Sequence, residues 1–207
     1  KGFLDRYLFI LTTNYDDLLE RSFESAGEPY DLVTYIAEGE DRGRFRHRSP
    51  DGKVSVIRVP KKFIAVSPER RSVILKIHGA IERLRPDEDS FVITEDDYID
   101  YLTRTDLSDL VPVNLLAKLR NSHLLFLGYG LQDWNLRAIL YRISSERKRS
   151  WQSWAIQLDP DELEQRFWMA RDVTILNVEL EQYVAELERR LESLGAGPER
   201  PSGAAHV

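Results

Sequence analysis

Short continuous apolar runs, each followed by polar residues and a helical pattern, recur along this chain. They cover Tyr7 to Thr13, Val73 to Ile77, His123 to Leu127, Trp154 to Leu158 and Val173 to Val178. Lys76, inside the second run, is awkward for burial and needs either an edge position or a partner. Runs of this length without polar alternation are typical of parallel strands covered on both faces. The sequence therefore predicts an α/β fold, a doubly wound and mostly parallel sheet with helices on both faces.

Helical patterns fill the intervals between these strands. They predict a helix after Asp17 that ends near Gly27, a helix behind Asp133, and others over 94–102, 113–120, 161–170 and 180–194. Acidic residues at the start of the first helix suit the positive end of its dipole. We expect one domain over residues 1–195, followed by a flexible tail or linker over 196–207 that is rich in Gly, Pro and Ala.

Residues 28–72 do not continue this alternation of strands and helices. Val54–Val59 and Phe63–Val66 read as short strands around Pro60, and we expect a small antiparallel hairpin insert outside the main sheet. The basic run Arg42–Arg48 contains His47 and is followed by turn residues, which predicts a solvated loop or hairpin tip. A flap that faces a phosphate or a partner is the alternative.

Composition excludes several kinds of chemistry. The 207 residues contain no cysteine, which excludes disulfides, thiolate zinc sites and cysteine nucleophiles. We find no spacing typical of metal ligands and expect no metal. The net charge of −6 makes a direct nucleic-acid partner unexpected.

No apolar stretch approaches the roughly 20 residues that a membrane span needs, and no signal segment opens the chain, so we expect a cytoplasmic protein. Because the chain lacks an initiator Met and opens almost directly on a strand, we expect it to be a piece of a longer protein.

Reactive polar residues follow the first two runs. Thr12, Thr13, Asn14 and Asp16 end the first run, and His78-Gly79 ends the second. An Asn amide donates and accepts, and Asp accepts from hydroxyls, so the first set suits a ribose diol or a water molecule. The alternative is that Asn14 and Asp16 only tie the turn and cap the helix. His78 could act as a general base near neutral pH, or it could be a satisfied core histidine.

A third segment, Gly128-Tyr129-Gly130, follows the 123–127 run and precedes Asp133, a candidate N-cap. Amides at a helix start attract phosphate or ribose oxygens, although one glycine pair could also be a plain tight turn. In an open α/β sheet, ligands bind beyond the carboxyl ends of the parallel strands. The three segments therefore predict one small-molecule site at a single sheet edge.

In this order, Thr13-Asn14-Tyr15-Asp16, His78-Gly79 and Gly128-Tyr129-Gly130 with Asp133 resemble the sirtuin-like domains of bacterial anti-phage defence proteins. The similarity covers most of residues 5–180, and the pairing of Asn with His is its more specific part. The resemblance implies a Rossmann-like NAD-binding domain that hydrolyses NAD to nicotinamide and ADP-ribose. Control by a homo-oligomer or by a partner defence protein is a further implication.

The resemblance also implies roles by position. Asn14 would hold the ribose or the attacking water, and His78 would be the base. The residues implied to bind NAD around them are Thr12, Thr13, Asp16, Gly79, Gly128, Tyr129, Gly130 and Asp133. The alternatives are a module that senses NAD or ADP-ribose without cleaving it, and an NAD-dependent deacylase or ADP-ribosyl transferase.

Two departures from that family stand out. The zinc module of deacetylase sirtuins is held by cysteines, which this chain lacks, so deacylation is less expected. The Gly-rich loop that grips the diphosphate is not among these residues either. It lies upstream or has been lost, and we do not expect this fragment alone to be catalytically complete.

Overall fold

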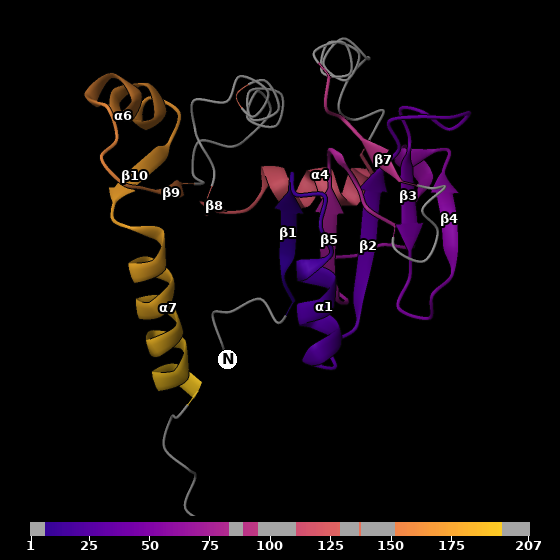
Figure 1. Cartoon of the computed structure of the whole chain (residues 1–207), viewed down its shortest axis with the longest axis horizontal. Coiled ribbons are helices and arrows are strands. Elements are labelled where there is room, and N and C mark those ends of the chain that lie inside the picture. Colours follow the sequence, from indigo (N-terminus) through magenta and orange to yellow (C-terminus); the bar gives the residue numbers. More distant parts are fainter. Residues whose placement is uncertain (1–6, 83–88, 95–110, 129–136, 138–151, 196–207) are drawn as a thin grey trace, which may run out of the picture. The chain divides into compact units, whose positions relative to one another are not determined.

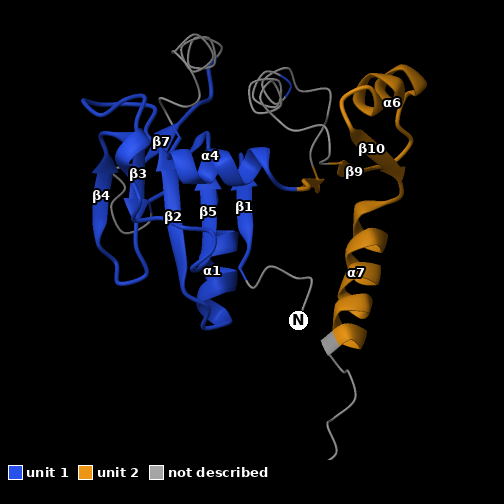
Figure 2. Ribbon diagram, turned by 180° about the vertical axis from the view of Figure 1, so that it is seen from behind, with its two compact units in different colours: residues 1–122, 134–148 blue, residues 123–133, 149–207 orange. Residues whose placement is uncertain are grey.

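The computed structural model describes residues 7–82, 89–94, 111–128, 137 and 152–195. The chain divides into two compact units (Figure 2). Unit 1 comprises residues 1–122 and 134–148, and unit 2 comprises residues 123–133 and 149–207. The extent of the domain over 1–195 stays a prediction. The expected tail over 196–207 and the helices over 94–102 and behind Asp133 lie outside the described residues.

Unit 1 is built on a five-stranded sheet with the order β1-β5-β2-β3-β4 (Figure 1). Its strands are β1 (Phe9–Thr12), β2 (Tyr30–Tyr35), β3 (Phe45–Arg48), β4 (Val54–Ile57) and β5 (Ser72–Lys76). β5 runs parallel to both β1 and β2, whereas β3 and β4 are antiparallel. All five residues of β5 are buried, as expected for a parallel strand covered on both faces, and the middle three are apolar.

Helices lie on both faces of this sheet, as the sequence predicts. Helix α1 (Leu18–Ser25) stands in front of the strands in Figure 1, and α4 (Val113–Arg120) lies behind them. Leu115, Leu116 and Leu119 bury one stripe of α4, and Asn114 donates a side-chain hydrogen bond to the carbonyl of Val66. The α/β fold with mostly parallel strands is confirmed.

The prediction for residues 28–72 is partly wrong. β3 and β4 do form an antiparallel hairpin, but they extend the main sheet through β2, a strand that the sequence pattern did not predict. Phe63–Val66 is not a strand, and Pro60–Lys62 forms a short 3-10 helix, η1. Proline lacks the N–H that a strand ladder requires, so the chain turns there instead.

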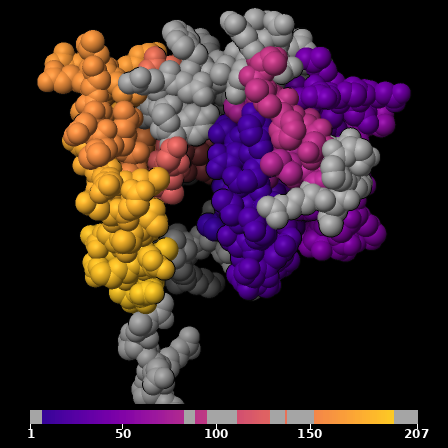
Figure 3. All heavy atoms as spheres, in the orientation of Figure 1, coloured from indigo at the N-terminus to yellow at the C-terminus, as the bar shows by residue number. Residues whose placement is uncertain are grey.

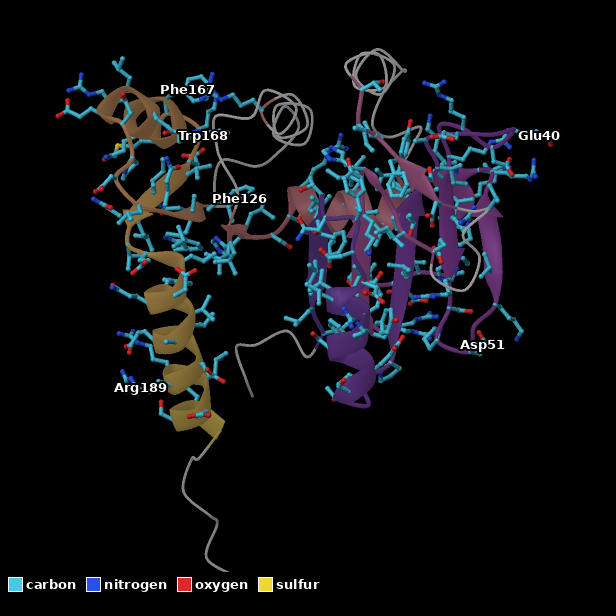
Figure 4. The ribbon with its side chains drawn as sticks, in the orientation of Figure 1. Glu40, Asp51, Phe126, Phe167, Trp168 and Arg189 are labelled. Atoms are coloured by element: carbon cyan, nitrogen blue, oxygen red, sulfur yellow. The ribbon has the colours of Figure 1, made fainter. Side chains whose placement is uncertain are left out.

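The prediction for the basic run is correct in part, because turns lie before and after a strand that it did not include. The second half of the run is β3, in which Phe45 and His47 are buried and face away from Arg46 and Arg48. The hairpin tip lies after the strand, at Ser49–Lys53, where Ser49 N–H bonds the Lys53 carbonyl at 3.0 Å. Asp51 marks this tip in Figure 4.

Unit 2 contains a separate three-stranded parallel sheet with the order β10-β9-β8. Its strands are β8 (Leu125–Phe126), β9 (Ser153–Gln157) and β10 (Val173–Asn177), and β8 is shorter than the sequence predicts. Helices α6 (Glu162–Met169) and α7 (Leu180–Gly195) match their predicted ranges. Trp168, labelled on α6 in Figure 4, is almost fully buried and anchors this helix in the unit 2 core.

Candidate functional site

The first two polar segments of the sequence lie at one edge of the unit 1 sheet. β1 and β5 are adjacent and parallel, with Thr12 opposite Lys76, so the chain leaves both strands at the same end. The Ile77 N–H donates to the Thr12 carbonyl at 3.1 Å and continues the pairing past the strand ends. Asn14 and His78 are each two residues beyond this paired position. This geometry is the one on which the predicted site depends.

Hydrogen bonds around Tyr15 join the two segments. The Ile81 N–H donates to the Tyr15 carbonyl at 2.9 Å, and the Tyr15 hydroxyl donates to the Val92 carbonyl at 2.6 Å. The Val92 N–H in turn donates to the His78 carbonyl at 2.9 Å. The ring of Tyr15 packs edge-on against Phe91, with 5.2 Å between centroids. Together these contacts hold the turn after β1 against the turn after β5.

The turn that carries Asn14 is ordered by its own side chains. The Thr12 hydroxyl accepts from the Asn14 N–H at 3.1 Å, and Asp16 Oδ1 accepts from the Leu18 N–H at 3.0 Å, at the start of α1. Asp16 therefore ties the turn to the first residue of α1, which is one of the roles that the sequence left open. Asn14 itself is exposed, so its amide is accessible to a ligand.

His78 differs from Asn14 in its burial, since only 4% of its surface is exposed. It precedes β6 (Gly79–Ala80), which pairs antiparallel with β7 (Ser90–Phe91). Gly79 has a φ of +96°, and a Cβ placed on it would lie 1.8 Å from the carbonyl oxygen of Ser90. Only glycine fits here, because the backbone is left-handed and β7 approaches it directly.

Lys76 is the buried residue at this edge that the sequence marked as awkward. It needed either an edge position or a partner, and β5 is an inner strand. Its partner is Glu20 on α1, with Nζ 2.6 Å from Oε1, and Nζ also donates to the Asp16 carbonyl. Glu20 could not be identified as this partner from the sequence, because it lies far from Lys76 along the chain.

Two clefts lie beside α1, the indigo helix whose surface faces the reader in Figure 3. The larger has a volume of about 620 Å³ and lies between the end of α1 and the β3–β4 hairpin, with Tyr30, Arg48 and Glu24 in its lining. The smaller has about 260 Å³ and reaches Asp17 and Ile81 near the site edge. Of the residues described in its lining, Asp17, Glu20, Glu24 and Glu82 are acidic, and Arg21 and Arg48 are basic. This excess of carboxylates disfavours a diphosphate in the smaller cleft.

The third predicted segment lies in unit 2 by chain division. Gly128 has a φ of +63°, which suits its glycine, while Tyr129, Gly130 and Asp133 lie outside the described residues. The structure therefore places two segments at one sheet edge, Thr12–Asp16 at the end of β1 and His78-Gly79 after β5, and it gives no placement of the glycine pair against them.

Of the other histidines, the structure describes His47 and His123, and both make contacts with residues that are not part of this sheet edge. His47 Nε2 lies 2.7 Å from Asp31 Oδ1 in the core, and Arg71 Nε lies 3.2 Å from the other oxygen of the same carboxylate. His123 is exposed and its Nδ1 lies 2.7 Å from the Gln152 carbonyl. In the described part of the chain, no group of three or more histidine and acidic side chains could hold a metal ion. None of the described helices is long and apolar enough to cross a membrane.

Fold and site thus define an α/β domain with a polar cluster at the carboxyl edge of adjacent parallel strands. Residues 8–176 match the family of SIR2-like domains, and the chain belongs to that family, which confirms the resemblance seen in the sequence. The chain is also 28% identical over 132 residues to a protein of Cytobacillus dafuensis named NAD(+) hydrolase ThsA. That similarity covers 64% of this chain but only 20% of the relative, so the chain spans about a fifth of that protein's length.

Proposed function

We propose that this domain is an NAD glycohydrolase that cleaves NAD to nicotinamide and ADP-ribose. The observation that carries the proposal is the position of Asn14 and His78 beyond neighbouring parallel strands, at one edge. Membership of the SIR2-like family and the name of the Cytobacillus dafuensis relative support NAD as the substrate. The absence of cysteine argues against the zinc module of protein deacetylases.

The chemistry requires few groups. The bond between the ribose C1′ and the pyridinium nitrogen breaks, its electron pair stays on the nitrogen, and nicotinamide leaves as a neutral ring. Water then adds to the oxocarbenium-like C1′ and loses a proton, which balances the reaction as ADP-ribose, nicotinamide and one proton. Because the leaving group is neutral, no general acid is needed. The enzyme has to orient the ribose and stabilise the developing cation.

The two residues suit complementary parts of this reaction. The exposed amide of Asn14 can donate to a ribose oxygen or accept from the attacking water. The buried imidazole of His78 can accept a proton from a ribose hydroxyl or from water, in surroundings that exclude bulk solvent. Asp16 would support the same site, and its Oδ1 also holds the turn by accepting from the Leu18 N–H.

The biological setting is a further part of the proposal. We propose that the domain is the effector of a bacterial anti-phage protein that acts in the cytoplasm by abortive infection, through depletion of NAD. Control by assembly of identical chains or by a partner protein would restrain such an activity. The family and the relative's name support the link to NAD, and these finer statements extend beyond them.

The test is nicotinamide release from NAD by the full-length protein that contains this domain. We expect Asn14→Ala and His78→Ala each to lower kcat roughly 100- to 10,000-fold, the range of general acid–base catalysis. His123→Ala is the matched control, since that exposed histidine makes its ring contact with Trp154 in unit 2 and should leave kcat unchanged. Full turnover in both site variants would refute the assignment.

Other products would identify the alternatives. Tight NAD or ADP-ribose binding without product after long incubation would indicate a sensing module. Transfer of ADP-ribose to a protein, or loss of an acetyl group from lysine, would indicate a transferase or a deacylase.

A further inference from the structure

A buried cation lies directly beneath the turn that carries Asn14. Lys76 is the last residue of β5, an inner strand of the sheet, and it is fully buried. Lysine is almost never fully buried unless it is paired. Its register partners are Thr12 on β1 and Thr34 on β2, so the three side chains share one face of the sheet. That face is the one that α1 covers.

The Lys76 ammonium makes two contacts on this face. Glu20, in the first turn of α1 and 4% exposed, places Oε1 2.6 Å from Nζ. The second contact is a hydrogen bond from Nζ to the main-chain carbonyl of Asp16. One amine thus ties the inner strand β5 to the helix start and to the turn between β1 and α1.

Stability alone does not account for this arrangement. Removing two charges from water is costly, and buried ion pairs can often be replaced by well-packed apolar residues at no loss of stability. An apolar pair could hold α1 on the sheet equally well. It could not donate a hydrogen bond to the Asp16 carbonyl, which is the specific contribution of the lysine.

We propose that Lys76 is a positioning residue for Asn14, with Glu20 balancing its buried charge. The amine fixes the Asp16 carbonyl, and the turn from Thr13 to Asp17 is then held at both ends, since the Thr12 hydroxyl binds the Asn14 N–H. Displacement of a substrate-orienting group by about 1 Å can cost about 100-fold in rate. This inference rests on the proposed NAD hydrolysis in its kinetic part only.

The kinetic test replaces the pair by apolar residues, as Lys76→Met with Glu20→Leu in the full chain. We expect the double variant to fold with an unchanged or higher melting temperature, while kcat for nicotinamide release falls about 10- to 100-fold and KM changes less. A merely structural pair would change the melting temperature and leave kcat of the folded protein intact. That result would overturn the proposal.

The matched control is the buried pair of His47 and Asp31, on the opposite face of the sheet. Asp31→Leu with His47→Leu removes a comparable buried interaction from strands β2 and β3. It should lower the melting temperature, because Arg71 also loses its carboxylate partner, and it should leave kcat of the folded protein nearly unchanged. An equal loss of kcat in both double variants would show that any disturbance of the core slows the enzyme, and would also overturn the proposal.

A second measurement does not depend on NAD cleavage. Loss of the Lys76 hydrogen bond should speed hydrogen exchange of the Asn14 and Leu18 amides, which are bonded within this turn, but not of amides in β2. If the native chain does not cleave NAD, the proposed function fails, and this exchange experiment alone decides on Lys76. Unchanged exchange at both amides would refute the positioning role. Should the apolar variant not fold, Lys76→Gln with Glu20→Gln tests the same expectations with neutral amides.

Discussion

Gly79 is the residue whose identity the site geometry restricts most. Its φ of +96° and the 1.8 Å distance from a built Cβ to the Ser90 carbonyl oxygen leave no room for a side chain. We predict that Gly79→Ala lowers the free energy of unfolding by about 3 kcal/mol, because strain and a backbone clash add together. Denaturant titration at equilibrium measures this loss.

Gly52 provides the matched control for that substitution. Its φ is +79°, and a Cβ there meets no atom within 4 Å. Gly52→Ala should therefore cost only about 1 kcal/mol, the penalty of a left-handed backbone without a clash. Equal losses of unfolding free energy in the two variants would show that β7 does not approach Gly79 closely enough to exclude a Cβ.

Tyr30 makes the free energy of unfolding depend on pH in the alkaline range. Burial, together with a hydrogen bond to Glu24, raises the pKa of its hydroxyl to about 12 from the usual 10. Between pH 10 and 12 the unfolded chain loses this proton while the folded chain keeps it, so stability is complete below pH 10 and falls as pH rises. Because the ring is only half-buried, solvent screening reduces the loss to about 1 kcal/mol.

The measurement is the pH dependence of unfolding in the native chain and in Tyr30→Phe. From pH 10 to 12 the native chain should lose more stability than the variant, which lacks the ionising group. Identical slopes in this window would show that the Tyr30 hydroxyl titrates normally.

Among the secondary-structure elements, those with simple apolar periodicity were predictable from the sequence. β1, β5, β9 and β10 and helices α1, α4, α6 and α7 follow such patterns closely. β2 was missed because Asp31 interrupts its apolar run, and that carboxylate pairs with His47 and Arg71 from other parts of the chain. β3 was missed because its arginines suggested a loop. Its strict alternation, Phe45-Arg46-His47-Arg48, was the signal that could have identified a half-buried strand.

Helix α6 offers a prediction on element stability. Asp161 is its N-cap, and Oδ1 accepts a hydrogen bond from the Leu163 N–H at 2.6 Å. Asp161→Ala should lower the stability of unit 2 by about 1 kcal/mol, since an amide at the helix start loses its acceptor. Asp161→Ser, which restores a capping oxygen, should recover most of this loss. Hydrogen exchange along α6 is the readout, and unchanged protection in Asp161→Ala would contradict the capping role.

For the molecule as a whole, the sequence predicted that Asn14 and His78 follow strands ending at one sheet edge, but not the long-range contacts that hold this edge together. The prediction used two facts: the apolar runs stop at polar residues, and parallel strands end at the same edge of a sheet. These were enough to predict that Asn14 and His78 lie at one edge. The expectation that NAD is the substrate came from the family resemblance, because no single residue pattern in the sequence specifies NAD. Glu20 and the hydrogen bonds through Tyr15 and Val92 could not be predicted, because long-range pairs depend on how the strands are ordered in the sheet.

Ligand binding should stabilise the whole folded chain if this edge holds NAD. A ligand that binds only the folded state at about 100 times its Kd adds about 2.7 kcal/mol to the free energy of unfolding. We predict such an NAD-dependent rise in melting temperature for the catalytically slow His78→Ala variant, in which the substrate persists.

Asn14→Ala should show a smaller rise, because Asn14 orients the ribose in the proposed reaction. Nicotinamide alone, which lacks the ribose, controls for nonspecific effects. No shift with NAD in either variant or in the native chain would mean that this edge does not bind the dinucleotide, and the hydrolase assignment would fall with it.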